Sequence, residues 1–393
     1  MLEKDAIIAF ISLQFVSFFF FSGLRTLYPL ILEFTLGLGE KDVVSSWSLI
    51  YTFTLLIGFL TRLPMGIIAD RFTRRHAILF GSFLCLLSLI GMLFSDEVIV
   101  LALLFGLLRT GIHIFPLISR QGVKESHPDY HGRMNSFIHI SGNTGALLGP
   151  IILTFIFELS YQLLIISSSL FLILVNILFL FTIPRKTKFP DMPIREQLKK
   201  SVHEILKLKV IAFIFIVNGI INGIYTSVQV PYARYVLLLS STGIGLIVGF
   251  VQILAVIVIF FTGELVDKFG SQKVLFIGII IEILAGISIV FQSTDIFIFI
   301  FSQVLFKAGT SVITMASLTH FTLHVSKTTF STSFGATTSF FFLGSAMVPY
   351  LSGDLYLLNP IFPYIFIVVI CLLLIPLLFF MTKNTFKVPI IEK

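Results

Sequence analysis

Two short stretches, GIIADRFTRRHAIL (residues 66–79) and GELVDKFGSQKVL (residues 263–275), place the same residue pattern in the two halves of the chain. Each begins with a glycine, followed after three residues by an aspartate and then directly by a cation. The two aspartates, Asp70 and Asp267, lie 197 residues apart in a chain of 393 residues. This spacing indicates two equivalent halves.

The composition indicates a membrane protein. The chain is 56% hydrophobic and 12% charged, and its mean hydropathy is +1.03. A soluble domain carries roughly 25% charged residues, so this chain lacks the polar groups to cover a water-exposed surface. Its two cysteines, Cys85 and Cys371, fall inside apolar runs, which predicts buried thiols and no disulfide. The amino-terminal stretch MLEKDAIIAF has mixed charges and leads into a long apolar run, which is not typical of a cleavable signal.

The hydrophobic pattern predicts an all-α membrane protein with twelve transmembrane helices, since about 20 apolar residues cross the hydrocarbon core. An amino-terminal six-helix bundle is expected over residues 1–183 and a carboxyl-terminal one over residues 209–393. Between them, residues 184–208 form a linker with a short amphipathic helix at the membrane surface. The predicted spans are 6–31, 43–69, 76–94, 97–121, 133–157, 160–183, 209–237, 242–266, 272–292, 295–321, 329–352 and 359–381.

The basic residues predict the orientation. If both termini and the loops after the even-numbered spans are cytoplasmic, that side holds 21 of the 27 Lys and Arg residues. The opposite side then holds only Lys41 and Arg234. By the positive-inside rule, this bias places both termini in the cytoplasm. The net charge of +7 is therefore explained by membrane orientation, and no nucleic-acid partner is expected.

The duplicated stretch and the six-plus-six pattern resemble the major facilitator superfamily, over the whole chain. The loop motif of that family is matched in the second half by Gly263, Asp267, Lys268, Gly270 and Lys273, and in the first half by Gly66, Asp70, Arg71, Arg74 and Arg75. Thr73 stands where the second glycine of the first copy would be, which weakens the inference of a tight left-handed turn there but not the resemblance to the family. The resemblance implies two pseudo-symmetric bundles that rock about a site near the bilayer midplane.

In this family the motif residues gate the cytoplasmic side, and the same role is implied here. The aspartate of each copy would lie near the amino-terminal end of a helix in the opposite half, where the helix dipole favours a negative charge. The receiving helix for Asp70 would start near TTFSTS, and that for Asp267 near GRMNSF. The alternative is that both stretches are solvated loops with an orienting charge only.

Small residues predict close helix packing between the halves. Gly145, Gly149 and Pro150 lie on span five, and Gly245 and Gly249 lie on span eight. Glycines four residues apart let helices approach closely, and in this fold spans five and eight face each other. The glycine–proline pattern also resembles the drug/proton antiporter branch, although Ile151 to Thr154 replace the glycine pair that follows in that signature.

Ionisable residues inside the spans suggest a cationic cavity. Such residues are costly in a membrane and usually face the bundle interior. In this fold spans one, four, seven and ten line the cavity, and none of them carries a mid-span Asp or Glu. The candidate substrate-binding residues on these spans are Arg25, Tyr28, Arg109, His113, Asn218, Asn222, Tyr225, Gln229 and Lys307.

Two interpretations of these cations remain open. Guanidinium groups suit carboxylates and phosphates, so the cations could bind an anionic substrate. Alternatively, Arg109 could brace neighbouring helices, together with Arg62 on span two. Glu282, on the normally peripheral span nine, has no evident role.

The sequence therefore predicts a monomeric secondary transporter of the plasma membrane that moves a small organic solute, anionic or amphipathic, by alternating access. One alternative is a proton-coupled exporter of lipophilic drugs, with His113 or His139 as the proton carrier. A second is a non-transporting receptor on the same fold. No enzyme activity, cofactor or metal is expected, and proton coupling is possible. The expected partners are the substrate and the lipid bilayer.

Overall fold

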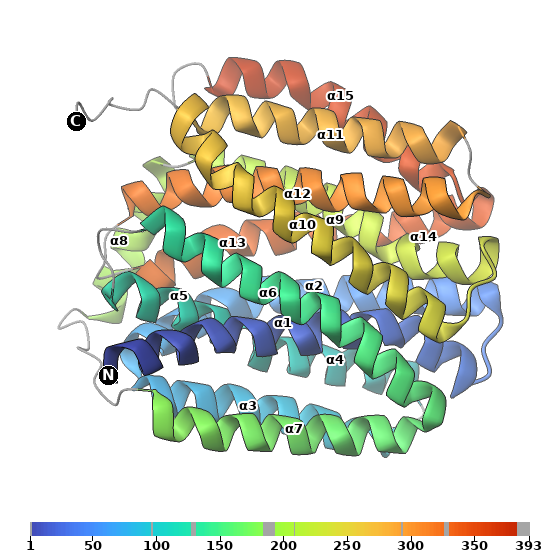
Figure 1. The fold of residues 1–393 in the computed structure, drawn as a ribbon, viewed down its shortest axis with the longest axis horizontal. Coiled ribbons are helices and arrows are strands. Elements are labelled where there is room, and N and C mark those ends of the chain that lie inside the picture. The colour runs from blue at the N-terminus through green and yellow to red at the C-terminus, as the bar shows by residue number, and fades with distance from the viewer. Residues whose placement is uncertain are drawn as a thin grey trace.

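The computed structural model describes residues 2–95, 97–126, 131–183, 193–207, 209–291, 294–325 and 330–382, and all regular elements in these ranges are helices (Figure 1). The first half contains α1 (Leu2–Phe34), α2 (Glu40–Arg71), α3 (Arg74–Met92), α4 (Val98–Ile112), α5 (Ile114–Ser126), α6 (His131–Leu159) and α7 (Tyr161–Thr182). The connecting helix is α8 (Ile194–Lys207). The second half contains α9 (Lys209–Pro231), the π-helix η1 (Tyr232–Val236), α10 (Ser241–Phe269), α11 (Ser271–Phe291), α12 (Ile296–His324), α13 (Phe330–Ala346), α14 (Pro349–Leu358) and α15 (Phe362–Thr382).

The long helices have the length and composition of membrane spans. Eleven segments of the described chain qualify, and each is at the position of a predicted span. The twelfth predicted span corresponds to α15, a helix of 21 residues with an apolar sequence. We call the end of the bundle at which α1 begins and α15 ends the terminal end, and the opposite end the distal end (Figure 1).

Two predicted spans are broken, and a proline explains each break. Span four divides into α4 and α5 at His113, because Pro116 has no N–H to donate to the carbonyl of Ile112. Span eleven divides into α13 and α14, and Pro349 opens α14. Span eleven consequently reaches Leu358, beyond the predicted end at residue 352.

The helix contacts repeat between the halves. In the first half α1 packs on α6, α3 on α4, α2 on α4 and α3 on α7. The equivalent pairs of the second half are α9 with α13, α11 with α12, α10 with α12 and α11 with α15. Two equivalent pairs, α2 with α13 and α6 with α10, join the halves. This is the packing expected of a duplicated six-helix unit.

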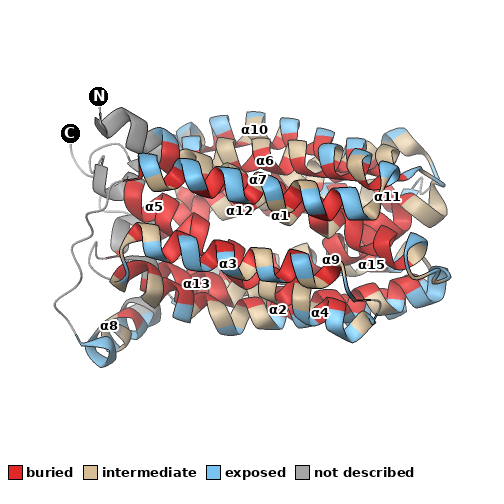
Figure 2. Cartoon of the chain, turned by 90° about the horizontal axis from the view of Figure 1, so that it is seen from below, coloured by how far each residue is buried: buried red, intermediate tan, exposed pale blue. Residues whose placement is uncertain are grey.

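The exposed outer face of the bundle is apolar. Figure 2 shows exposed residues along the outward faces of the helices, with buried residues toward the interior. Phe155 and Phe181, for example, are 58% and 82% exposed. Water would not tolerate so large an apolar surface, whereas acyl chains cover it without cost.

The connecting helix α8 forms as expected from its spacing, and Ile194 and Val202 are both about half exposed. Their apolar side chains are therefore not covered by the rest of the protein. This suits a helix at a membrane surface.

The two copies of the duplicated stretch turn differently. Gly270 has a φ of +82°, which glycine adopts without a steric penalty. Thr73, at the equivalent position, has a φ of −60°, and its hydroxyl accepts a hydrogen bond from the N–H of His76. Thr73 thus caps the start of α3, and the left-handed turn that the motif implies is absent from the first copy.

The packing glycines divide between two interfaces, which corrects one expectation. Gly245 and Gly249 of α10 do face α6, where an added Cβ would lie 2.8 Å from the Pro150 carbonyl oxygen and 2.6 Å from that of Leu147. Gly145 and Gly149 instead face α1, and a Cβ atom at either position would overlap a main-chain carbonyl oxygen of that helix. The pair on α6 therefore faces α1, whereas the pair on α10 packs against another side of α6. Glycine spacing alone does not determine how a helix is rotated toward its neighbours.

This close approach of α1 and α6 can be tested with Gly149→Ala. The added methyl would overlap the Phe19 carbonyl, and relief requires a backbone shift that costs about 1–3 kcal/mol. We expect a lower Tm on heating the detergent-solubilised protein. The matched control is Gly243→Ala in the first turn of α10, where the nearest atom to the added Cβ is the Ser240 hydroxyl, at 3.2 Å. The higher helix propensity of alanine should keep the control at or above the wild-type Tm. Equal Tm values for the two variants would contradict this packing.

Candidate functional site

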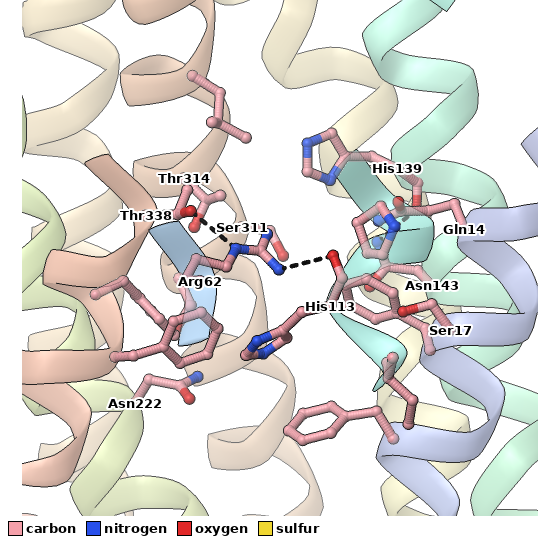
Figure 3. A pocket seen from close by; sticks show the side chains of 18 of the residues that line it. Gln14, Ser17, Arg62, His113, His139, Asn143, Asn222, Ser311, Thr314 and Thr338 are labelled. Atoms are coloured by element: carbon pink, nitrogen blue, oxygen red, sulfur yellow. Dashed lines mark hydrogen bonds between the residues drawn. The ribbon is translucent and has the colours of Figure 1, made fainter. Parts of the chain in front are cut away.

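A cavity of about 250 Å³ lies between the two halves, lined by α1, α2, α4, α5, α6, α9, α10, α12 and α13. Figure 3 shows polar side chains converging on it from both halves, His139 and Gln14 from the first half and Asn222 and Thr314 from the second. Both halves therefore contribute to one site, as alternating access requires.

Positive charge dominates the cavity wall. Five cations line it, and no Asp or Glu is among the described lining residues. Four of the five belong to the first half. The cations are Arg25, Arg62, Arg109, Arg120 and Lys307.

Arg109 is the most enclosed of these cations. It is 3% exposed and lies between two phenylalanine rings, with its Cζ 4.3 Å from the ring centre of Phe21 and 4.7 Å from that of Phe342. The rings come from opposite halves and offer their negative faces to the guanidinium group. Its Nε and Nη1 atoms have no hydrogen-bond partner. Two donors are thus left for an acceptor from outside the chain.

Arg62 joins three segments. Its Nε donates to the Thr338 hydroxyl of α13 at 3.1 Å, and its Nη1 donates to the His113 carbonyl at 3.3 Å (Figure 3). That carbonyl lies at the junction of α4 and α5. Arg62 thus makes bracing contacts, as predicted, and it also lines the cavity.

Arg120 was not predicted as a site residue. The sequence places it next to the loop after span four, but α5 continues to Ser126, so Arg120 lies within the helix and is 8% exposed. Its Nη2 is 3.2 Å from the Nε2 of His139 on α6. The signal that could have revealed it is Pro116, since the break it causes reorients the helix that follows.

The second half supplies a row of polar groups. Lys307, Thr310, Ser311 and Thr314 of α12 all line the cavity. Residues spaced by three, four and seven share one face of a helix, so α12 presents one ammonium group and three hydroxyls along a single stripe. These hydroxyls can orient a bound solute.

Five of the predicted substrate-binding residues line the cavity: Arg25, Arg109, His113, Asn222 and Lys307. The other four are not among the lining residues, and each makes a polar contact with another residue. The Tyr28 hydroxyl donates to the Leu101 carbonyl at 3.0 Å. The Asn218 amide donates to Thr314 at 3.0 Å, and Gln229 donates to the Tyr225 hydroxyl at 3.0 Å.

At the terminal end, Asp70 joins the halves where the sequence places it. Its Oδ2 accepts hydrogen bonds from the backbone N–H of Thr332 at 2.9 Å and from the Thr332 hydroxyl at 2.6 Å. Thr332 lies in the first turn of α13, where backbone N–H groups have no helical partner. One turn further on, Gly335 lies so close to α2 that an added Cβ would be 2.8 Å from the Arg62 carbonyl oxygen and 3.6 Å from the Gly66 Cα.

The basic residues of the duplicated stretch hold nearby segments. The Arg75 Nε donates to the Ile183 carbonyl at 2.9 Å, and the Arg74 guanidinium lies 4.9 Å from the ring centre of Phe10. Arg71 ends α2. In the second copy, the Lys268 ammonium lies 5.5 Å from the ring centre of Phe269. The surroundings of Gly263 and the side chain of Asp267 lie outside the described part of the structure.

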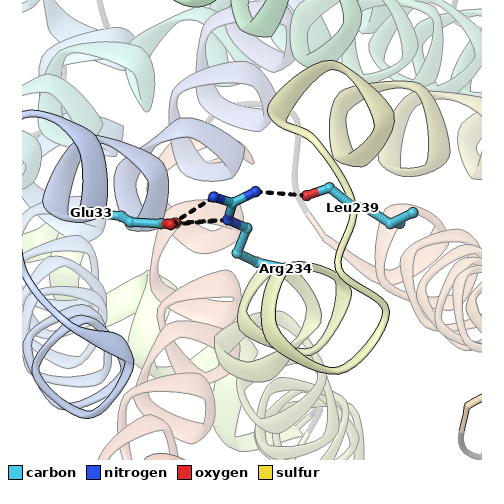
Figure 4. A network of polar contacts seen from close by, with 3 residues as sticks. All are labelled: Glu33, Arg234 and Leu239. Carbon is cyan, nitrogen blue, oxygen red and sulfur yellow. Dashed lines mark hydrogen bonds and ion pairs between the residues drawn. The ribbon is translucent and has the colours of Figure 1, made fainter.

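At the distal end, an ion pair joins the halves. Arg234 of η1 donates to Glu33 of α1 through both Nε and Nη2, with a shortest distance of 2.7 Å, and its Nη1 donates to the Leu239 carbonyl (Figure 4). The π-turn that follows Pro231 aims Arg234 at α1. Two further bonds cross between the halves here, from Trp47 to the Ser227 carbonyl at 3.0 Å and from the Thr242 N–H to Glu158 at 2.8 Å.

Two helical bundles around a central cavity, with contacts between the bundles at both ends, define a multi-pass membrane transporter fold. The family model described as Major Facilitator Superfamily matches residues 10–230 and again residues 211–392. The chain belongs to this superfamily. Among curated proteins, none matches it by sequence.

Solved transporter structures share the fold. The human organic anion transporter MFSD10 (TETRAN) aligns with a TM-score of 0.77 and 14% identity, covering 96% of this chain and 99% of that one. The nucleoside transporter NupG aligns with a TM-score of 0.71 and 15% identity, over 97% and 100% of the two chains. A bacterial homolog of the human lysosomal transporter Spinster aligns with a TM-score of 0.68 and 13% identity, over 98% of each chain. Identities this low establish the fold alone.

The distal ion pair should contribute modestly to stability. Glu33 and Arg234 are partly exposed but paired through two nitrogens, so we expect a coupling free energy of about 0.5–1 kcal/mol from a double-mutant cycle of Glu33→Gln and Arg234→Gln. The measurement is the free energy of unfolding of the two single variants and the double variant. The coupling should shrink at high salt. Additive effects at low salt would contradict the pairing.

Proposed function

We propose that this protein moves a small organic anion across the membrane by alternating access, with the solute bound in the central cavity. The observation that carries the proposal is the set of five cations on a wall whose described residues include no carboxylate. Like charges in a site of low dielectric repel one another, so a bound anion offsets a cost that the empty cavity carries.

The geometry of the cations favours a carboxylate, phosphate or sulfonate. Such groups accept two parallel hydrogen bonds from a guanidinium fork. Arg109 has two donors without partners, and Arg25 and Lys307 line the same cavity from α1 and α12. The head of the anion would therefore lie among these three residues.

The rest of the wall suits an apolar or aromatic body. Six phenylalanines line the cavity: Phe18, Phe21, Phe215, Phe334, Phe341 and Phe342. An amphipathic anion would use both kinds of surface. MFSD10, which shares the fold, is an organic anion transporter, and this supports the same substrate class.

A proton-coupled exporter of lipophilic compounds is the second candidate, because those six rings would also hold an uncharged or cationic drug. The charge of the described lining residues weighs against a cationic substrate, since a lipophilic cation would meet five positive charges and no carboxylate among them. The two candidates therefore differ in the sign of charge that the cavity prefers.

Alternating access needs a gate at each end of the bundle, and polar contacts join the halves at both the terminal and the distal end. We assign Asp70 with Thr332 to the terminal gate and Glu33 with Arg234 to the distal gate. The strong bias of Lys and Arg toward the terminal side supports a cytoplasmic location for that end. We propose the plasma membrane as the location of the protein.

The gate assignment predicts the effect of Asp70→Asn. An uncharged amide loses the attraction to the amino terminus of α13, so the terminal end should open more often and transport should slow severalfold, while solute binding persists. Flux in proteoliposomes and labelling of cysteines introduced at the terminal end measure the two effects. Asp354→Asn, at an exposed position on α14, is the matched control. Wild-type flux and labelling in Asp70→Asn would contradict the gate.

The substrate assignment predicts which ligands stabilise the protein. Naphthalenesulfonate is a suitable probe, because it joins a permanent negative charge to an aromatic body. At about 100 times its dissociation constant it should stabilise the fold by roughly 2.7 kcal/mol. Arg25→Gln and Lys307→Gln should each weaken its binding about tenfold or more, whereas Lys41→Gln, at an exposed position near the distal end, should not.

Arg109→Gln separates binding from bracing. If Arg109 only braces α1 and α13, its loss destabilises the empty protein and leaves the probe affinity near the wild-type value. If it binds the anion, the affinity falls. Stabilisation by the lipophilic cation tetraphenylphosphonium but not by naphthalenesulfonate would overturn the anion proposal in favour of the exporter.

A further inference from the structure

A buried glutamate lies behind the cavity wall, outside the site described above. Glu282 is near the middle of α11 and is 0% exposed. Its side chain packs against Gly309 of α12, and its Oε1 lies 3.0 Å from the Thr310 hydroxyl, which lines the cavity. Its Oε2 has no hydrogen-bond partner. An ionisable residue buried in a membrane bundle is costly, and such residues usually mark an ion or substrate pathway.

The two contacts of the Thr310 hydroxyl bear on the protonation state of Glu282. The Thr310 hydroxyl lies 2.9 Å from the Phe306 carbonyl as well as 3.0 Å from Glu282. A hydroxyl has one proton to donate but can also accept. Thr310 can donate fully to the carbonyl while Glu282, as the neutral acid, donates to Thr310, and both contacts are then complete hydrogen bonds. The geometry suits a protonated carboxyl group.

No cation faces Glu282 from the described residues packed around it. From α12 it meets Gly309 and Thr310, and from α15 its titratable neighbour is Cys371. The described charged groups of α10, Glu264 and Lys268, lie in the last turns of that helix. The nearest cation along α12 is Lys307, one turn from Thr310 and inside the cavity.

We propose that Glu282 is the proton-carrying residue of this transporter, with Thr310 as its link to the cavity. In this conformation the proton is on the carboxyl group. In another stage of the cycle the proton passes by way of the Thr310 hydroxyl to water in the cavity and leaves a carboxylate on Glu282. The proposal rests on the proposed function, since it names the ion that moves with the anion.

The sign of the coupling follows from charge. A carboxylate behind Thr310 places a negative charge beside the stripe that carries Lys307, where it competes with a bound anion. The neutral acid removes this competition, so the anion and the proton favour each other's binding and cross together. A unit charge about 10 Å away in a partly buried setting changes the affinity of an anion roughly tenfold.

The test uses naphthalenesulfonate, whose own charge does not change with pH. Its affinity for the wild-type protein should fall roughly tenfold as Glu282 ionises with rising pH. Glu282→Gln, which mimics the neutral acid, should retain the tight affinity at every pH. Glu264→Gln, the same change at an exposed position of α10, should behave as the wild type does. Wild-type pH dependence in Glu282→Gln overturns the proposal and transfers the role to His113 or His139.

Infrared spectroscopy of the full-length protein tests the proton site without any ligand. The carbonyl band of a protonated carboxylic acid should be present in the wild type, lose intensity as the pH rises and be missing from Glu282→Gln. Thr310→Val is a second variant, for use if Glu282→Gln does not fold. It should shift this band, because the neutral acid loses its acceptor. A band that is the same in all three proteins, or that does not change with pH, overturns the proposal.

The binding and infrared experiments distinguish failure of the anion substrate from failure of the proton site. A titrating Glu282 band in a protein that does not bind naphthalenesulfonate would contradict the anion substrate and support the proton site. Anion binding without a Glu282 band would do the reverse.

Discussion

The mutual repulsion of the cations in the central cavity is the constraint on which the site depends. Arg25, Arg62, Arg109, Arg120 and Lys307 are held together inside a membrane bundle, with no carboxylate among the described lining residues. The protein offsets part of the cost locally: Arg109 lies between two aromatic rings, Arg62 donates to a hydroxyl and a carbonyl, and Arg120 lies beside His139. These contacts disperse the charge without neutralising it. In the proposed function, a bound anion offsets the repulsion that these contacts leave.

Polar contacts at the two ends of the bundle join the halves on either side of the cavity. At the terminal end a carboxylate meets the first turn of α13, and at the distal end a bidentate ion pair and two further hydrogen bonds cross between the bundles. Between the ends, α10 approaches α6 through Gly245 and Gly249, so the backbones touch with little side-chain interlocking. In the proposed function, polar contacts of this kind can be exchanged when one bundle moves against the other.

Glu282 connects this charge balance to the rest of the second half. The cavity holds the fixed positive charge, and the one fully buried glutamate of the described core lies a single hydroxyl away from it, between α11 and α12. If that group gains and loses a proton, the cavity has an adjustable negative charge that opposes the fixed positive ones. Anion affinity and proton occupancy are then linked through distance and dielectric, without a direct contact between the two.

The sequence by itself determined the class, the membrane spans, the duplicated halves and the contact of Asp70 with the start of α13, because each depends on local hydrophobicity or on a repeated motif. It also identified five cavity residues from the rarity of charge inside a span. Only the tertiary structure decided that Gly145 and Gly149 pack on α1, that Tyr28, Asn218, Tyr225 and Gln229 lie off the cavity, and that Arg120 and the Thr310 partner of Glu282 lie at it. The physical reason is that rotation about a helix axis is set by packing against neighbours and by proline breaks. At 3.6 residues per turn, a small change in rotation moves a side chain from the cavity to a helix interface.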